Sequence, residues 1–173
     1  MTKRIRYRVG QFFRALTARV SDGEVERATR VLTPEAQALF RRQAIQDQRH
    51  ALAVYHTLQR AGCDDPHLLA AALLHDAGKA AARLSAVHRS IIVLLGRFAP
   101  GLLIRLSQGE GGGWDRPFVI HARHAEIGAR WAEEVGCSSL TVALVRRHED
   151  EPSDGATEED RLLAALQAAD DAN

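Results

Sequence analysis

Cysteine is scarce in this chain of 173 residues. Cys63 and Cys137 are the only two, and they lie far apart in no C-x-x-C pair. Two isolated thiols exclude a disulfide framework and a paired-cysteine zinc knuckle, and they favour a reducing compartment. Long apolar runs are also missing, because the longest, Leu68–Leu74 and Ile91–Leu95, fall far short of the roughly 18 residues that span a bilayer. No apolar segment with a small-residue cleavage site follows the basic N-terminus, so we expect a cytoplasmic protein without a transmembrane segment or secretory signal.

Aromatic residues make up only 5% of the chain, and its formal net charge is only +1. The chain has few aromatic side chains on which bases could stack and no large positive net charge, so no nucleic-acid partner is expected. The glycine-rich stretch 108–117 is not followed by a P-loop lysine, and no Gly-x-Ser-x-Gly motif occurs, which excludes P-loop and nucleophilic-serine chemistry. The charge is uneven, since residues 1–20 carry six cations and no acid. This pattern indicates a solvated helix or, as the second alternative, an arm that touches anionic lipid, RNA or a protein partner.

Alanine, leucine and arginine dominate instead, and no segment alternates with the period of a strand. Turn and capping residues divide the chain into amphipathic segments, which predict helices near 4–20, 34–62, 66–77, 80–98, 102–107, 118–135, 138–148 and 157–172. The length suits one domain, so the chain is expected to be an all-α, single-domain helical bundle. Within it, residues 1–33 are expected to form a basic amphipathic helical extension and residues 34–173 the main helical domain.

Histidine and aspartate recur on helix faces that should be buried. His75 shares a face with Leu68, Ala71 and Ala72, and Asp76 follows it at the helix end. The same placement recurs on or beside the apolar faces of four other predicted helices, at His50, His124, His148 and Asp170. A single such histidine would be interpreted as a hydrogen-bonded core residue. A shared cation explains why five helices each present an imidazole or a carboxylate in this way.

The string Leu73-Leu74-His75-Asp76-Ala77-Gly78-Lys79 closely resembles the signature of the HD-domain superfamily of metal-dependent phosphohydrolases. The segments around His50 and Asp170 are similar to two further motifs of that family, and the resemblance covers residues 45–172. It implies an HD-type helical domain in which one metal ion is held by His50, His75, Asp76 and Asp170. Many members hold a second ion, for which the resemblance implies His124 and His148, with Asp76 bridging. One or two divalent ions are therefore expected, from Mn, Fe, Co, Ni, Zn or Mg.

The resemblance further implies hydrolysis of a small phosphorylated substrate, such as a nucleotide or another phosphoester. Divalent ions can hold phosphoryl oxygens and lower the pKa of bound water from about 15.7 to roughly 7, which makes a nucleophile at neutral pH. The expected catalytic residues are Asp76, as the bridging ligand, and Lys79, as a point positive charge toward the phosphate.

Two other functions fit the same residues. Family relatives with a similar ligand set use a di-iron pair to activate oxygen, so an HD-type oxygenase is one alternative. The other is a non-catalytic module that binds a nucleotide messenger or a protein partner.

Two further residues could contribute to the site. Asp171 competes with Asp170 as the last ligand but lies on a less apolar face, and His121 could approach the site from one turn before His124. The apolar segment Ser90–Phe98 could pair with a copy of itself and so form a homodimer.

Overall fold

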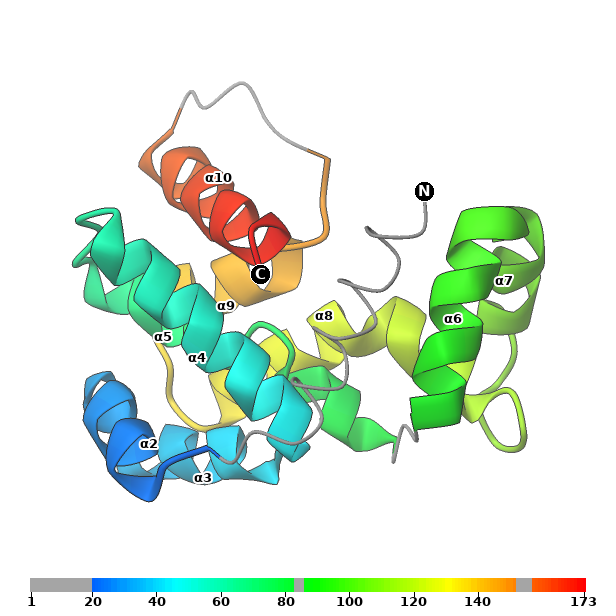
Figure 1. Ribbon diagram of the computed structural model, residues 1–173, viewed down its shortest axis with the longest axis horizontal. Coiled ribbons are helices and arrows are strands. Elements are labelled where there is room, and N and C mark those ends of the chain that lie inside the picture. Colours follow the sequence, from blue (N-terminus) through cyan, green and yellow to red (C-terminus); the bar gives the residue numbers. More distant parts are fainter. Residues whose placement is uncertain (1–19, 83–85, 152–156) are drawn as a thin grey trace, which may run out of the picture.

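The computed structural model describes residues 20–82, 86–151 and 157–173. These residues form nine α-helices and two short 3₁₀ helices and contain no strand, which confirms the predicted all-α class (Figure 1). In chain order the elements are α2 (Asp22–Ala28), η1 (Thr29–Val31), α3 (Pro34–Arg42), α4 (Ile45–Arg60), α5 (Pro66–Leu74), η2 (Ala77–Ala81), α6 (Ala86–Phe98), α7 (Pro100–Ser107), α8 (Arg116–Glu134), α9 (Ser139–Arg147) and α10 (Glu158–Asp171). The helix expected over 4–20 lies outside the described residues, apart from its last position.

Four helices begin where capping residues stand in the sequence. The side chains of Thr33, Asp65, Ser138 and Thr157 accept hydrogen bonds from backbone N–H groups in the first turns of α3, α5, α9 and α10. Proline follows at the first position of α3 and α5, where its missing N–H removes no bond within the helix. Thr157 also forms a complete capping box with Asp160. These starts are therefore encoded locally.

The centre of the bundle is α5. Every residue from Leu68 to Leu74 is buried, and the helix packs against α3, α4, α9 and α10. A helix that is apolar on all sides is stable only when other elements surround it. Val25, Ala28 and Leu32, from the segment that the sequence assigned to an N-terminal extension, belong to the same buried core.

Near the core, two predicted helices have the wrong bounds and one helix was not predicted. The single helix expected over 34–62 is two helices, because Gln43 and Ala44 are extended, with ψ of 149° and 150°. The buried Gln43 side chain donates a 2.9 Å hydrogen bond to the carbonyl of Leu73, one of the last carbonyls of α5, which lack a partner within their own helix. The helix expected over 66–77 ends at Leu74 and continues as η2, and α2 was not predicted. The contact across to α5 is tertiary, so helical periodicity did not reveal the break at Gln43.

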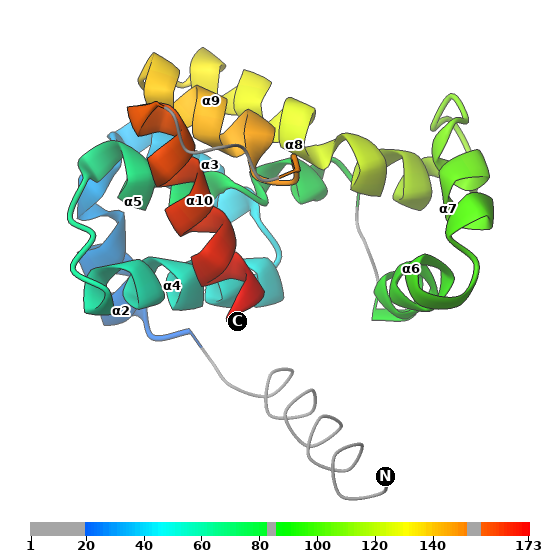
Figure 2. The ribbon, with the colours of Figure 1, turned by 90° about the horizontal axis from the view of Figure 1, so that it is seen from above.

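The long helix α8 connects the bundle to a hairpin of α6 and α7. It packs against η2 and α9 on one side of the molecule and against α7 at its other end, where Ser107 donates a hydrogen bond to the carbonyl of Phe118. Figure 2 shows the α6–α7 hairpin standing to one side of the other helices. The helix α6 begins at Ala86, six residues after its predicted start, and α7 begins at Pro100, two residues before its predicted start. Within the described part of the chain, no helix combines the length and the apolar character needed to cross a bilayer.

Candidate metal centre

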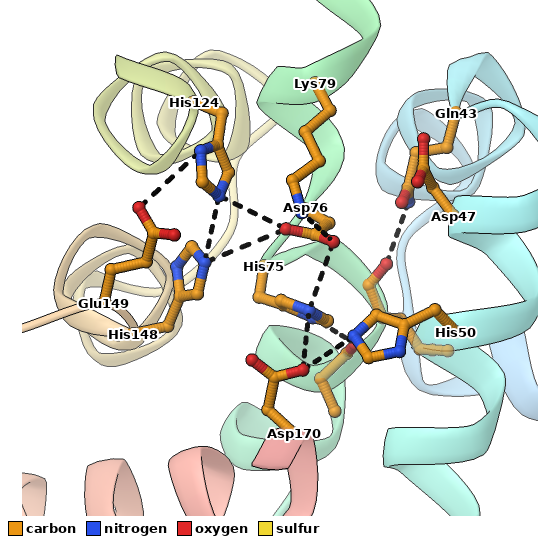
Figure 3. A network of polar contacts seen from close by, with 12 residues as sticks. Gln43, Asp47, His50, His75, Asp76, Lys79, His124, His148, Glu149 and Asp170 are labelled. Atoms are coloured by element: carbon orange, nitrogen blue, oxygen red, sulfur yellow. Dashed lines mark hydrogen bonds and ion pairs between the residues drawn. The ribbon is translucent and has the colours of Figure 1, made fainter. Parts of the chain in front are cut away.

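Six polar side chains from five helical regions meet beside the end of the central helix (Figure 3). They are the residues that the sequence singled out: His50 on α4, His75 and Asp76 directly after α5, His124 on α8, His148 directly after α9, and Asp170 at the end of α10. Four of the six are buried, whereas the side chains of His50 and Asp170 are 31% and 32% exposed. Residues up to 120 positions apart in the chain are therefore neighbours here.

Each buried histidine of the cluster is oriented by the backbone carbonyl three residues before it. The Nδ1 atoms of His75, His124 and His148 lie 3.0, 2.5 and 2.7 Å from the carbonyl oxygens of Ala72, His121 and Val145. Because a carbonyl oxygen only accepts hydrogen bonds, Nδ1 of each ring carries the proton. In the neutral ring Nε2 is then an acceptor, and in all three residues it faces the centre of the cluster. Histidine ligands of metal ions are oriented in this way in many proteins.

The first group of inward-facing atoms comes from His50, His75 and Asp76, which lie within 4.8 Å of one another. Asp170 joins them, since its Oδ1 lies 2.6 Å from Nε2 of His50 and 3.7 Å from Nε2 of His75. Among the described residues, Nε2 of His75 has no hydrogen-bond partner although it is buried. A buried polar atom without a partner is destabilising, and a cation between these atoms would satisfy it.

The second group comes from Asp76, His124 and His148, again within 4.8 Å of one another. Oδ1 of Asp76 lies 3.3 Å from Nε2 of His124 and 3.8 Å from Nε2 of His148, and the two Nε2 atoms are 3.3 Å apart. Three acceptors this close repel one another unless a proton or a metal ion lies between them. Asp76 is common to both groups, because its Oδ2 lies 3.6 Å from Nε2 of His75.

The surroundings favour an ionised Asp76 and a neutral His148. Burial by itself raises the pKa of Asp76. Without metal, the charge of a protonated His75, the hydrogen bond that a protonated His124 donates, and the charges of Lys79 and of that His124 hold this pKa well below its usual range. Burial, and then the charges of protonated His75 and His124, lower the pKa of His148 to about 4. Ionised carboxylates and neutral imidazoles are the forms that bind divalent metal ions. The donor set therefore fits one or two divalent cations.

Three charged or ionisable side chains border the cluster. Nζ of Lys79 lies 2.6 Å from Oδ2 of Asp76, and Oε2 of Glu149 lies 3.7 Å from Nδ1 of His124, on the edge of the ring that faces away from Asp76 (Figure 3). The ring of His121 stacks on that of His124 at 5.9 Å between centroids, which places it at the edge of the cluster. Asp171 is exposed, so Asp170 is the residue of this pair that faces the histidines.

The sequence interpretation missed two buried polar residues next to the site. The side chain of Gln43 donates a hydrogen bond to the carbonyl of Leu73, which lies two residues before His75. Asp47 lies one turn before His50 on α4 and forms a two-pronged ion pair with Arg89 of α6, at 2.7 and 2.8 Å. The spacing of three residues between Asp47 and His50 was a usable signal, because it places both side chains on one helix face. For Gln43 no such local signal exists.

Two glycines let the backbone of η2 approach α8 closely. A Cβ atom at Gly78 would lie 2.0 Å from the carbonyl oxygen of His124 and 2.7 Å from the backbone nitrogen of Gly128. A Cβ atom at Gly128 would in turn lie 3.1 Å from the nitrogen of Gly78. The glycine two residues after Asp76 is thus needed so that His124 can reach the carboxylate.

The His50–Asp170 pair makes the stability of the metal-free protein depend on pH. Burial alone lowers the pKa of His50, but the hydrogen bond to Asp170 and the charges of Asp76 and Asp170 outweigh it and raise the pKa above 6.5. Burial alone raises the pKa of Asp170, but the hydrogen bond to His50 and the charges of His75 and His50 lower it below 3.8. The histidine contributes stability that is complete below pH 6.5 and is lost as the pH rises through its folded-state pKa. The aspartate contributes stability that is present above pH 3.8, so the pair stabilises most between these limits.

We therefore expect Asp170→Asn to destabilise chelator-treated protein more at about pH 5.5 than at about pH 8.5. The difference should be about 1 kcal/mol or less, because the pair is partly exposed. Denaturant unfolding of both proteins at the two pH values measures it. Asp171→Asn, at the exposed neighbouring position, should show no such difference. Equal losses for Asp170→Asn at both pH values would mean that the ion pair does not form.

Comparison with known proteins found no relative of this chain, because no family model, curated protein or solved structure matches it. The chemistry of the cluster is therefore inferred from its donor atoms and from the resemblance of its motifs.

Proposed function

We propose that this chain is a metal-dependent phosphohydrolase that cleaves a small nucleotide or another phosphoester. The observation that supports this best is the position of Asp76, whose two carboxylate oxygens face different groups of ring nitrogens. A carboxylate shared in this way suits two divalent ions about 3.5–4 Å apart, an arrangement found in phosphatases and nucleases. The resemblance of the string around His75 to the HD-domain signature supports the same reaction.

In this proposal, one ion is held by His50, His75, Asp76 and Asp170, and the other by Asp76, His124 and His148. When bound, such ions polarise phosphoryl oxygens and lower the pKa of water so that it can attack phosphorus at neutral pH. The chain itself fixes the ligands, because three backbone carbonyls hold the imidazoles in one tautomer. Packing buries His75, Asp76 and both second-group histidines, so little geometric reorganisation is needed when substrate binds.

Of the side chains that border the cluster, Lys79 is the best placed to meet a phosphate. Its ammonium group lies 2.6 Å from Asp76, and its side chain is 22% exposed whereas that of Asp76 is 4% exposed. A phosphate arriving from solvent would therefore meet a positive charge at the rim. That charge would stabilise the negative charge on the phosphoryl oxygens in the transition state.

The direct test is turnover with added metal. Protein freed of metal by a chelator and then loaded with Mn²⁺, Co²⁺, Ni²⁺ or Fe²⁺ should release phosphate or a nucleoside from at least one member of a panel of nucleotides and simple phosphoesters. Metal content is measured on the same samples. Protein that binds metal but turns over no member of the panel would contradict the proposal, and oxygen consumption by iron-loaded protein with an organic substrate would favour the oxygenase alternative.

Lys79→Met is expected to lower kcat on the substrate found in this panel by about 100-fold, because a donor aimed at transition-state charge is lost. Both metal ions should stay bound, since an ammonium group offers no lone pair to a metal. Lys79→Arg is the matched control, and it should retain much more activity because it keeps the positive charge. Loss of metal together with activity in Lys79→Met would contradict a contact with substrate and indicate that Lys79 acts only by holding Asp76.

A further inference from the structure

One side of α6 is an apolar stripe that the described part of the protein does not cover. Val87, Ile91, Leu94 and Phe98 are spaced by four, three and four residues, so they lie along one face of the helix. Their exposed fractions are 66%, 38%, 55% and 77%. A contiguous row of large apolar side chains on the surface of a protein marks an interaction surface more often than isolated apolar residues do.

The opposite side of α6 attaches the helix to the rest of the molecule. Ile92 is 6% exposed, and Arg89 forms the two-pronged ion pair with Asp47 of α4. Leu103 of α7 packs where α6 has only Gly96, at 3.7 Å from an added Cβ. The stripe therefore faces outward on a hairpin that projects from the bundle (Figure 2).

The hairpin that carries the stripe has cations and no acid. Helices α6 and α7 contain no Asp or Glu, and Arg97 and Arg105 are exposed on them, whereas Arg89 is paired with Asp47 of α4. The α7 helix also exposes Leu102 and Ile104, at 47% and 58%. A partner that fits this hairpin must be apolar where the stripe lies and negatively charged around it.

A second copy of the chain meets only half of this requirement. Two stripes could pack together, but each would bring Arg97 beside another α6–α7 hairpin, whose two helices contain no carboxylate. A bilayer with anionic headgroups supplies both an apolar layer and negative charge, and a projecting convex hairpin can reach its surface.

We propose that the α6–α7 hairpin docks on anionic lipid membranes, with Val87, Ile91, Leu94 and Phe98 inserted at the interface and the hairpin arginines on the headgroups. The contact is peripheral, because the stripe covers one face of a 13-residue helix. It is independent of the metal centre, since none of the six cluster residues lies on α6 or α7.

Co-sedimentation of the full chain with large vesicles tests this proposal. Binding should be clear on phosphatidylcholine vesicles with about one third phosphatidylglycerol, weak on phosphatidylcholine alone, and reduced by high salt. Leu94→Asp should weaken partitioning at least about tenfold, because it removes a large apolar side chain from the contact. Arg97→Glu should weaken it at least about fivefold on anionic vesicles only.

Ile45→Asp is the matched control, because Ile45 is 58% exposed, close to the 55% of Leu94, but lies at the first position of α4. It should leave vesicle binding unchanged. Equal binding by Leu94→Asp and the unaltered protein would overturn the proposal.

Light scattering without vesicles provides a second check. A dimer that Leu94→Asp converts to a monomer would also overturn the proposal, because another copy of the chain would then cover the stripe.

Discussion

Replacing Asp76 by Asn is expected to leave the protein with almost no bound divalent metal and with phosphoester turnover no higher than that of the metal-free protein. Of the residues that the structure describes, Asp76 alone belongs to both groups of candidate ligands, with one oxygen facing His75 and the other facing His124. The amide keeps the size of the side chain but removes its charge and one acceptor. The affinity for both ions should fall by about 100-fold or more, since even changes to residues that only support metal ligands cost 10–100-fold. Elemental analysis after dialysis, together with metal titration, measures this loss.

The expected pattern separates Asp76 from the other carboxylate of the cluster. Asp170→Asn should weaken only the first ion, because Asp170 meets His50 and His75 and not the second pair of histidines. Asp171→Asn, at the exposed adjacent position, should bind both ions normally. Circular dichroism of Asp76→Asn shows whether the helices persist. Full metal occupancy in a folded Asp76→Asn protein would refute the proposal that Asp76 is a ligand of both ions, and with it the hypothesis that the site binds two ions.

Gly78→Ala should both destabilise the fold and weaken the second ion. The new Cβ would lie 2.0 Å from the carbonyl oxygen of His124, and neither that backbone nor the facing Gly128 nitrogen, at 2.7 Å, can rotate away as a flexible side chain could. Helix α8 must therefore move, and His124 moves with it. Overpacking of this kind costs about 1–3 kcal/mol, which for a chain of this size lowers the thermal midpoint by roughly 2–12 °C.

Gly101→Ala is the control for the loss of a glycine as such. A Cβ at Gly101 meets no atom within 4 Å, and the residue lies in α7, where alanine is the better helix former. Its thermal midpoint should be unchanged or slightly higher. If Gly78→Ala melted at the same temperature as the unaltered protein and bound both ions equally well, the backbone contact between η2 and α8 would not exist in solution.

Local signals were sufficient for several parts of the fold. Thr33 with Pro34, and Asp65 with Pro66, predict the starts of α3 and α5, because capping and proline act within one helical turn. The uninterrupted apolar run Leu68–Leu74 predicts a buried helix, and it forms the centre of the bundle. The break at Gln43 escaped prediction because it is stabilised by a hydrogen bond to Leu73, 30 residues away. Periodicity describes one helix at a time and contains no information about such a contact.

For the candidate site too, some residues could be predicted from the sequence and others could not. Helix-face placement identified His75, His124 and His148 as inward-facing, and the structure brings these side chains together with His50, Asp76 and Asp170. Their role as metal ligands is still a prediction, as are the hydrolase activity and the HD-type assignment. The ion pair of Asp47 with Arg89 and the position of Lys79 against Asp76 came only from the structure.

The sequence alone therefore determined the helical class, the starts of the capped helices α3, α5, α9 and α10, and the identity of the inward-facing histidines and aspartates, because each depends on residues within a few turns. Tertiary packing decided that one carboxylate, Asp76, lies between two sets of imidazoles and that the apolar stripe of α6 faces outward. Both depend on distances between separate helices, which are set by the way side chains and glycine backbones pack rather than by local propensity.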